Sequence, residues 1–280
     1  FHYLKIQNWD ELLANYRQSS EWLEALSLGL KIYQGTNTIL PDVPLDEKDR
    51  KEKIRYTLRN MILEYVSSYT SSHLTNNNKN VEDSTRLKSD CINISIEFCI
   101  EMNDIDYLFN QIQPTLDNNR LSDLFYERLE PFILCDKIKN QNIGDLTISK
   151  IVDLYIKKGK FDMLSRLLTH LDIQSIKDES IINICTENNL VTPLIYIYMN
   201  AGDKEENCFK PIEIMYDMYV NAILISNLDS YNDCLNLVEV NVLEKSKQYV
   251  YHKLFWYINL ILDQKKFPLN NPIDNKQYEL

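Results

Sequence analysis

The feature that most constrains the fold is a short pattern that ends one helical run and begins the next. A small or polar residue breaks the run, an apolar residue stands two positions later, and an apolar residue or proline stands five positions later. The breaks are Ser20, Asn103, Gly159 and Asn188. Glycine and asparagine end helices because they tolerate the left-handed backbone conformation, and the +2 and +5 positions share one face of the next helix. The recurrence predicts stacked antiparallel helix pairs, an α-solenoid.

The composition points to the same fold class. The chain has 280 residues, of which only 5 are glycine and 8 are proline, while 44 % are apolar. Sheet-rich folds need more turn residues than this, and no segment of useful length alternates with the period of a strand. We therefore predict an all-α fold of the clathrin-repeat or TPR-like kind, forming a single α-solenoid segment over residues 1–280.

The same patterns place the elements along the chain. An opening helix pair is expected to end at Gly35, residues 36–45 and 74–83 are expected to be loops, and the tail 268–280 is expected to fray. The chain begins with Phe1, which indicates a segment of a longer protein. The remaining helices are predicted at 46–72, 84–102, 104–113, 119–130, 147–158, 160–171, 178–188, 190–201, 211–226, 231–238 and 242–264.

A cluster of large apolar residues marks one predicted helix junction. Phe125, Leu129, Phe132 and Ile133 are expected to be buried there. Pro131 is expected to open a new helix, where its missing N–H costs nothing, and so to set the bend between two helices.

Residue patterns typical of catalysis or metal binding are missing from the sequence. The histidines have no metal spacing, there is no phosphate-binding glycine loop, and the six cysteines are scattered without a C-x-x-C pair. The acidic run at 203–207 resembles half of a calcium loop but lacks the glycine and the closing glutamate. We therefore expect no enzymatic activity, no cofactor and no metal, and we interpret the cysteines as buried thiols.

Charge and hydropathy exclude two further classes of partner. The net charge is −11 at pH 7 and the sequence pI is about 4.9, whereas phosphate binding needs clustered lysine and arginine. Nucleic acid is therefore not the expected partner. The longest apolar stretch, 254–262, is well short of the ~20 residues that span a bilayer, so direct membrane insertion is not expected.

An aromatic run near the C-terminus is the one candidate interaction site. Phe255, Trp256 and Tyr257 are consecutive on a predicted helix and so point in three directions around it. Large aromatic residues at helical spacing are usually core, but one of these three is expected to be exposed or to cover a neighbouring repeat. We predict an interface at this position.

Three stretches go beyond generic solenoid spacing: 22–35, 124–134 and 167–198. The second reads L-F-Y-E-R-L-E-P-F-I-L, and the third ends in L-I-Y-I-Y. This succession resembles the central region of the vacuolar protein sorting protein eight family, the subunit specific to the endosomal CORVET tethering complex, in a fungal member. The likeness covers most of residues 9–226 and is weakest in the asparagine-rich loop and the last fifty residues.

The resemblance implies an α-solenoid segment between an N-terminal β-propeller and a C-terminal RING-type zinc domain. It also implies a cytoplasmic protein that is peripheral on the endosome, or on the vacuole or late endosome. Its implied partners are the class C core subunits and, through the full-length protein, an early-endosomal Rab-type GTPase. None of these contacts is assigned to a residue.

These observations together predict a non-catalytic scaffold that supports vesicle tethering, membrane fusion and endosome-to-vacuole protein transport through protein contacts, with weak sites adding by avidity. One alternative is another helical-repeat adaptor, such as a sister tether or coat subunit. A second is a helical-repeat RNA-binding protein, against which the net charge counts. A third is an all-α enzyme, which would need a deep polar pocket with convergent carboxylates.

Overall fold

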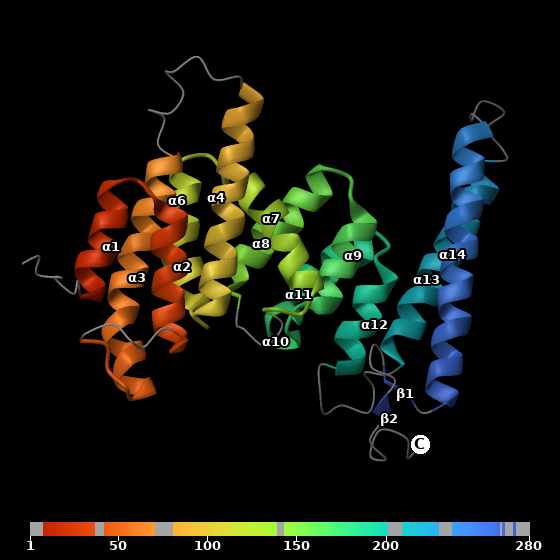
Figure 1. The fold of residues 1–280 in the computed structure, drawn as a ribbon. Helices are drawn as coiled ribbons and strands as arrows, with labels where there is room; N and C mark the ends of the chain where they lie inside the picture. Colours follow the sequence, from red (N-terminus) through yellow and green to blue (C-terminus); the bar gives the residue numbers. More distant parts are fainter. Residues whose placement is uncertain are drawn as a thin grey trace, which may run out of the picture. The chain divides into compact units, whose positions relative to one another are not determined.

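The computed structural model describes residues 8–36, 42–70, 81–138, 143–200, 209–229, 237–263, 265–266 and 271–272. The chain forms two compact units, Phe1–Ile138 and Lys139–Leu280. Each is built almost wholly of helices, which confirms the all-α, TPR-like prediction (Figure 1). That residues 1–280 form one solenoid segment stays a prediction.

In the first unit, neighbouring helices along the chain pack against one another. Helix α1 contacts α2, α2 contacts α3, α3 contacts α4, and α4 also contacts α7. The loop prediction at 36–45 agrees with the irregular backbone at 42–46, and residues 37–41 lie outside the described part. The helices are α1 (Trp9–Gln18), α2 (Trp22–Gln34), α3 (Glu47–Thr70), α4 (Val81–Glu101), α5 (Ile105–Tyr107), the π-helix η2 (Leu108–Ile112), α6 (Gln113–Asn118) and α7 (Ser122–Leu134).

The second unit continues the pattern and closes on a pair of long helices. Helix α8 contacts α9, α9 contacts α12, α12 contacts α13, and α13 runs against α14. Within the predicted tail, strand β2 pairs antiparallel with β1, Lys265 opposite Pro272. The elements are α8 (Asp145–Lys157), α9 (Phe161–His170), α10 (Ile173–Ile176), α11 (Glu179–Glu187), α12 (Val191–Asn200), α13 (Lys210–Asp229), α14 (Leu237–Leu262), β1 (Lys265–Lys266) and β2 (Asn271–Pro272).

The four predicted breaks, and one further break, are tight elbows with the same hydrogen bonds. One residue has a left-handed backbone, and its own N–H donates to the carbonyl three residues back at 2.9–3.2 Å. The following N–H donates to the carbonyl five residues before it at 2.7–3.0 Å. This is the Schellman arrangement, which satisfies the last carbonyls of the helix. The elbow residues and their φ angles are Ser20 (61°), Asn103 (50°), Arg120 (58°), Gly159 (65°) and Asn189 (54°).

The apolar residue that follows each elbow anchors the next helix. The side chain five positions after the left-handed residue is at most 2 % exposed at every elbow. The next helix therefore begins with one residue already fixed in the core. The residues in this position are Ala25, Leu108, Phe125, Leu164 and Leu194.

Two details of the predicted elbows are corrected by the structure. The left-handed residue of the fourth elbow is Asn189 and not Asn188, so the register there is one residue later. A fifth elbow is centred on Arg120, which the sequence pattern missed because arginine is not a usual helix breaker.

The prediction that Pro131 opens a new helix is wrong. Pro131 lies inside α7, which continues to Leu134, and the amide of Cys135 donates to the Pro131 carbonyl at 3.0 Å. Leu129 and Ile133 lie one turn apart and are both buried. Their packing holds the helix together across the lost hydrogen bond, because tertiary contacts dominate helix stability.

Other boundaries differ more modestly from the predicted ones. Phe125, Leu129 and Ile133 are buried as expected, but Phe132 is only half-buried. Residues 81–83 of the predicted loop 74–83 belong to α4, and 74–80 lie outside the described residues. The short helix α10 was not predicted, and α14 begins at Leu237, inside the first of two helices expected there.

A charged pair ties the elbow between α4 and α5 to α3. Arg59 on α3 donates from Nε and Nη2 to both carboxylate oxygens of Asp104, each at 2.7 Å, and Asp104 is buried directly after Asn103. The Tyr107 hydroxyl donates to the Arg59 carbonyl at 2.8 Å, and the hydrogen bonds to Asp104 raise the pKa of Arg59. A bidentate pair of this kind fixes orientation as well as distance.

Candidate interaction surface

The predicted aromatic site lies on the last two turns of α14, and the structure divides its three residues between core and surface. Tyr257 is 0 % exposed and packs in a core cluster with Val250 and Leu260 of the same helix. Phe255 is 59 % exposed and Trp256 is 38 % exposed. Successive helical residues point about 100° apart, so three consecutive aromatics cannot share one environment. That Phe255 and Trp256 contact a partner stays a prediction.

A lysine lies between two aromatic rings on the same helix. The Nζ atom of Lys253 is 5.7 Å from the ring centroid of Tyr249 and 5.3 Å from that of Trp256. The spacing of four and three residues places all three side chains on one face of α14. A cation over the face of an aromatic ring is attracted by the ring quadrupole. We call Tyr249, Lys253 and Trp256 the aromatic–lysine stripe.

Among the residues that the structure describes, no acidic side chain forms an ion pair with Lys253. Lys253 is half-buried, and burial lowers the pKa of its ammonium group. The rings of Tyr249 and Trp256 therefore compensate part of the lost hydration, while the ammonium group keeps its capacity to donate hydrogen bonds.

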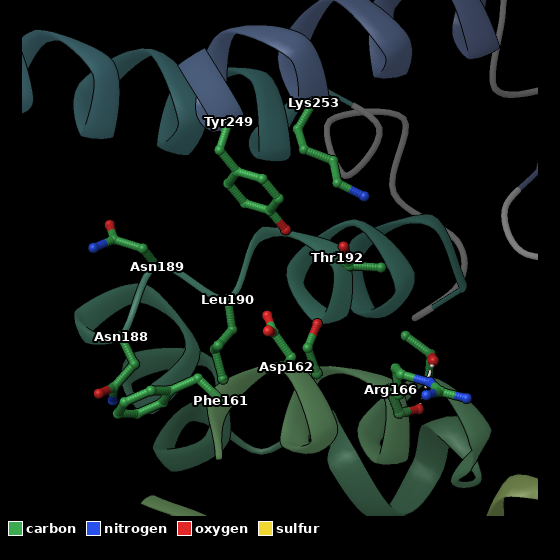
Figure 2. Close-up of a pocket in the computed structure, with 11 residues that line it drawn as sticks. Phe161, Asp162, Arg166, Asn188, Asn189, Leu190, Thr192, Tyr249 and Lys253 are labelled. Carbon is green, nitrogen blue, oxygen red and sulfur yellow. Dashed lines mark hydrogen bonds between the residues drawn. The ribbon is translucent and has the colours of Figure 1, made fainter. Parts of the chain in front are cut away.

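The stripe borders a groove of about 560 Å³ in the second unit. Figure 2 shows Tyr249 and Lys253 reaching from α14 toward the first turns of α9 and α12. Helix α9 contributes Phe161, Asp162 and Arg166 to the opposite wall. The volume lies in the range of about 300–1,000 Å³ that is common for binding pockets.

The elbow between α11 and α12 also lines the groove. Asn188 and Asn189 line it there, and Leu190 supplies a buried apolar surface. The Asn188 side chain donates from Nδ2 to the Ile184 carbonyl at 2.9 Å, which caps the end of α11. The exposed Asn189 is held in the left-handed conformation, so the elbow presents a polar side chain at a fixed position.

The charges around the groove are unequal. Arg166 and Lys253 bring two positive charges, whereas Asp162 brings one negative charge. Asp162 lies in the first turn of α9, where the helix dipole favours a carboxylate. The groove is thus locally positive on a chain whose net charge is −11.

A second exposed apolar stripe runs along the other side of α14. Tyr251, Phe255 and Leu262 are each more than half exposed. The ring of Tyr251 lies 6.3 Å from that of Tyr219 on α13, tilted by 44°. Exposed aromatics on a rigid helix pair are typical of protein contact surfaces.

Signs of catalytic or metal chemistry are weak in the described part of the chain. No group of three or more histidine, cysteine or acidic side chains there could hold a metal ion. Burial raises the pKa of the Cys91, Cys99 and Cys185 thiols to about 12, which disfavours the reactive thiolate. The interpretation of the cysteines as buried thiols is wrong for Cys135, which is exposed just after α7. None of the described helices is long and apolar enough to cross a membrane.

Comparison with known proteins identifies the family of this chain. Residues 124–280, more than half of the chain, match the family described as Vps8 central TPR. The chain belongs to this family. The matched region includes both walls of the groove and the aromatic–lysine stripe. The expected resemblance to the vacuolar protein sorting protein eight family is therefore confirmed, and a fungal origin stays a prediction.

Two relatives bear the name vacuolar protein sorting-associated protein 8 homolog. The mouse protein, from Mus musculus, is 24 % identical over 221 residues, which are 75 % of this chain and 15 % of the relative. The Homo sapiens protein is 23 % identical over 209 residues, 72 % of this chain and 14 % of the relative. This Vps8-family chain thus spans about one seventh of the length of these relatives. No solved structure matches it.

Proposed function

We propose that this Vps8-family chain is a non-catalytic scaffold segment of a vacuolar protein sorting subunit, the CORVET subunit of an endosomal tethering complex. The family match over residues 124–280 carries the proposal. The relatives' name supports a role in vacuolar protein sorting. The TPR-like stack of helices supports a scaffold, because such repeats expose extended surfaces to partners.

In this proposal the chain acts through protein contacts and supports vesicle tethering, membrane fusion and endosome-to-vacuole transport. The full-length protein lies in the cytoplasm, peripheral on the endosome, and joins the class C core and an early-endosomal Rab-type GTPase. The exposed surface of α14 supports a contact role, because Phe255 on one side of the helix and Trp256 on the other each leave apolar ring area open to solvent.

The test is crosslinking mass spectrometry on the tagged full-length protein purified from cells. We expect the class C core subunits to copurify, with crosslinks from lysines of this segment, such as Lys210 or Lys253, to those subunits. Purification of the full-length protein without tether subunits would refute the scaffold role. A matched full-length protein that lacks residues 124–263 reports whether assembly depends on this segment.

A further inference from the structure

We propose that the groove between α9, the α11–α12 elbow and α14 is a docking site for a short acidic peptide segment of a partner protein. Its carboxylates would accept hydrogen bonds from Lys253 and Arg166, and an aromatic or aliphatic side chain would pack on Tyr249 and Phe161. This inference rests on the proposed function in one respect: the segment works through protein contacts.

The charge of the groove selects an anionic ligand. Lys253 and Arg166 lie on opposite walls, on α14 and α9, and only Asp162 offsets them among the residues that line the groove. A carboxylate between these walls would give Lys253 the counter-charge that it lacks among the described residues. Hydrogen bonds between ionised partners are roughly twice as strong as neutral ones.

The remaining lining selects a peptide over a bare anion. Phe161 is 37 % exposed and Tyr249 is 45 % exposed, so ring surface is available on both walls. Asn189 and Thr192 add an amide and a hydroxyl group to the lining of the groove, where they could pair with the peptide backbone. Figure 2 shows the Tyr249 ring and the Lys253 stem entering the groove from the same helix. Apolar surface combined with a few convergent polar groups is typical of peptide sites.

The overall charge of the chain argues against an anionic membrane as the ligand. A lipid surface meets a whole face of a protein, and the net charge here is −11, which repels acidic lipid headgroups over about a Debye length. A short peptide samples only the local field of the groove, where the positive charges outnumber the negative one.

The experiment measures fluorescence anisotropy of a labelled peptide, GEDFDEG, titrated with this chain. Its matched neutral copy is GQNFNQG. We expect GEDFDEG to bind at least about tenfold more tightly than the neutral copy, since hydrogen bonds to ionised groups are roughly twice as strong as neutral ones. Binding should weaken as salt rises.

The decisive variant is Lys253→Gln, which keeps the stem and removes the charge. We expect it to weaken GEDFDEG binding about tenfold, with Arg166→Gln acting in the same direction. The control is Lys157→Gln, an exposed lysine on α8 outside the groove, which should leave binding unchanged. Circular dichroism confirms that each variant keeps its helices.

Several results would overturn the inference. They are no binding of GEDFDEG, equal binding of both peptides, or equal effects of Lys253→Gln and Lys157→Gln. Sedimentation of the chain with phosphatidylserine vesicles in the absence of peptide binding would assign the groove to a membrane instead. The full-length protein separates this failure from a failure of the scaffold role: if it still copurifies with the class C core, only the groove assignment falls.

Discussion

Replacing Gly35 with alanine should destabilise the fold in two ways, through backbone strain and through a clash with Arg50. Comparison with Gly159→Ala separates the two. Gly35 ends α2 with a φ of 79°, a conformation that other residues rarely adopt. A Cβ atom there would lie 2.5 Å from Nη2 and 2.9 Å from Cζ of the buried Arg50. Gly159 ends α8 with a φ of 65° and has nothing within 4 Å of a Cβ atom. Gly159→Ala therefore measures the backbone cost alone.

The expected magnitudes differ by a factor of about three. The left-handed backbone lowers the free energy of unfolding of an alanine variant by roughly 1–2 kcal/mol. The lower conformational entropy of the unfolded alanine chain raises it again by about 0.4–1 kcal/mol. Gly159→Ala should thus destabilise by about 1 kcal/mol. In Gly35→Ala the guanidinium must also move away from the Tyr33 and Leu45 carbonyls, to which it donates at 3.4 and 3.2 Å. Weakening bonds from a charged donor adds about 2 kcal/mol, for a total near 3 kcal/mol.

Urea unfolding followed by circular dichroism, with hydrogen exchange to assign the loss to α2 or α8, measures both variants. A double-mutant cycle with Arg50→Ala isolates the contact. In the Arg50→Ala background, Gly35→Ala should cost only the backbone share of about 1 kcal/mol. Equal costs for Gly35→Ala and Gly159→Ala, or a Gly35→Ala cost that Arg50→Ala leaves unchanged, would refute the role of Arg50.

Three further outcomes are expected from other parts of the structure. Phe125→Ala should destabilise by about 3–5 kcal/mol in urea unfolding, because the ring is fully buried in the core; a loss below about 1 kcal/mol would contradict that burial. Asp104→Asn should cost about 1.5–3 kcal/mol through its charged hydrogen bonds, whereas the exposed Asp106→Asn is the near-neutral control. Iodoacetamide at pH 8 should label the exposed Cys135 and spare Cys91, because burial raises the pKa of Cys91 to about 12. Peptide mapping by mass spectrometry measures the labelling, and faster labelling of Cys91 than of Cys135 would contradict the prediction.

The elbows were largely predictable because their chemistry is local. Serine, asparagine and glycine at a helix end, followed by an apolar residue, determine both the left-handed turn and the face of the next helix. Arg120 escaped notice because the same conformation there is held by the hydrogen bonds of the elbow and the burial of Phe125, neither of which its residue type reveals. Pro131 shows the opposite case. Its residue type predicts a helix boundary, but the packing of Leu129 and Ile133 keeps α7 continuous through it.

The groove could not be predicted from the sequence. Arg166 and Lys253 are far apart along the chain and line one groove only because α12, α13 and α14 pack around a shared core. The split of the aromatic run was partly predictable, since helical geometry requires different environments for Phe255, Trp256 and Tyr257. Which of them is buried depends on where α13 lies. The spacing of Tyr249, Lys253 and Trp256 in the sequence could have predicted the aromatic–lysine stripe, because it places a cation between two rings on one helix face.

The Schellman elbows leave the chain no slack between paired helices. Each uses a single left-handed residue, and the buried anchor follows it at a fixed distance of five residues. One inserted residue would rotate the following helix by about 100° and carry its anchor out of the core. Natural variation in length among Vps8-family chains should therefore avoid the elbows, and an alignment of distant members would show them as ungapped blocks even where residue identity is lost.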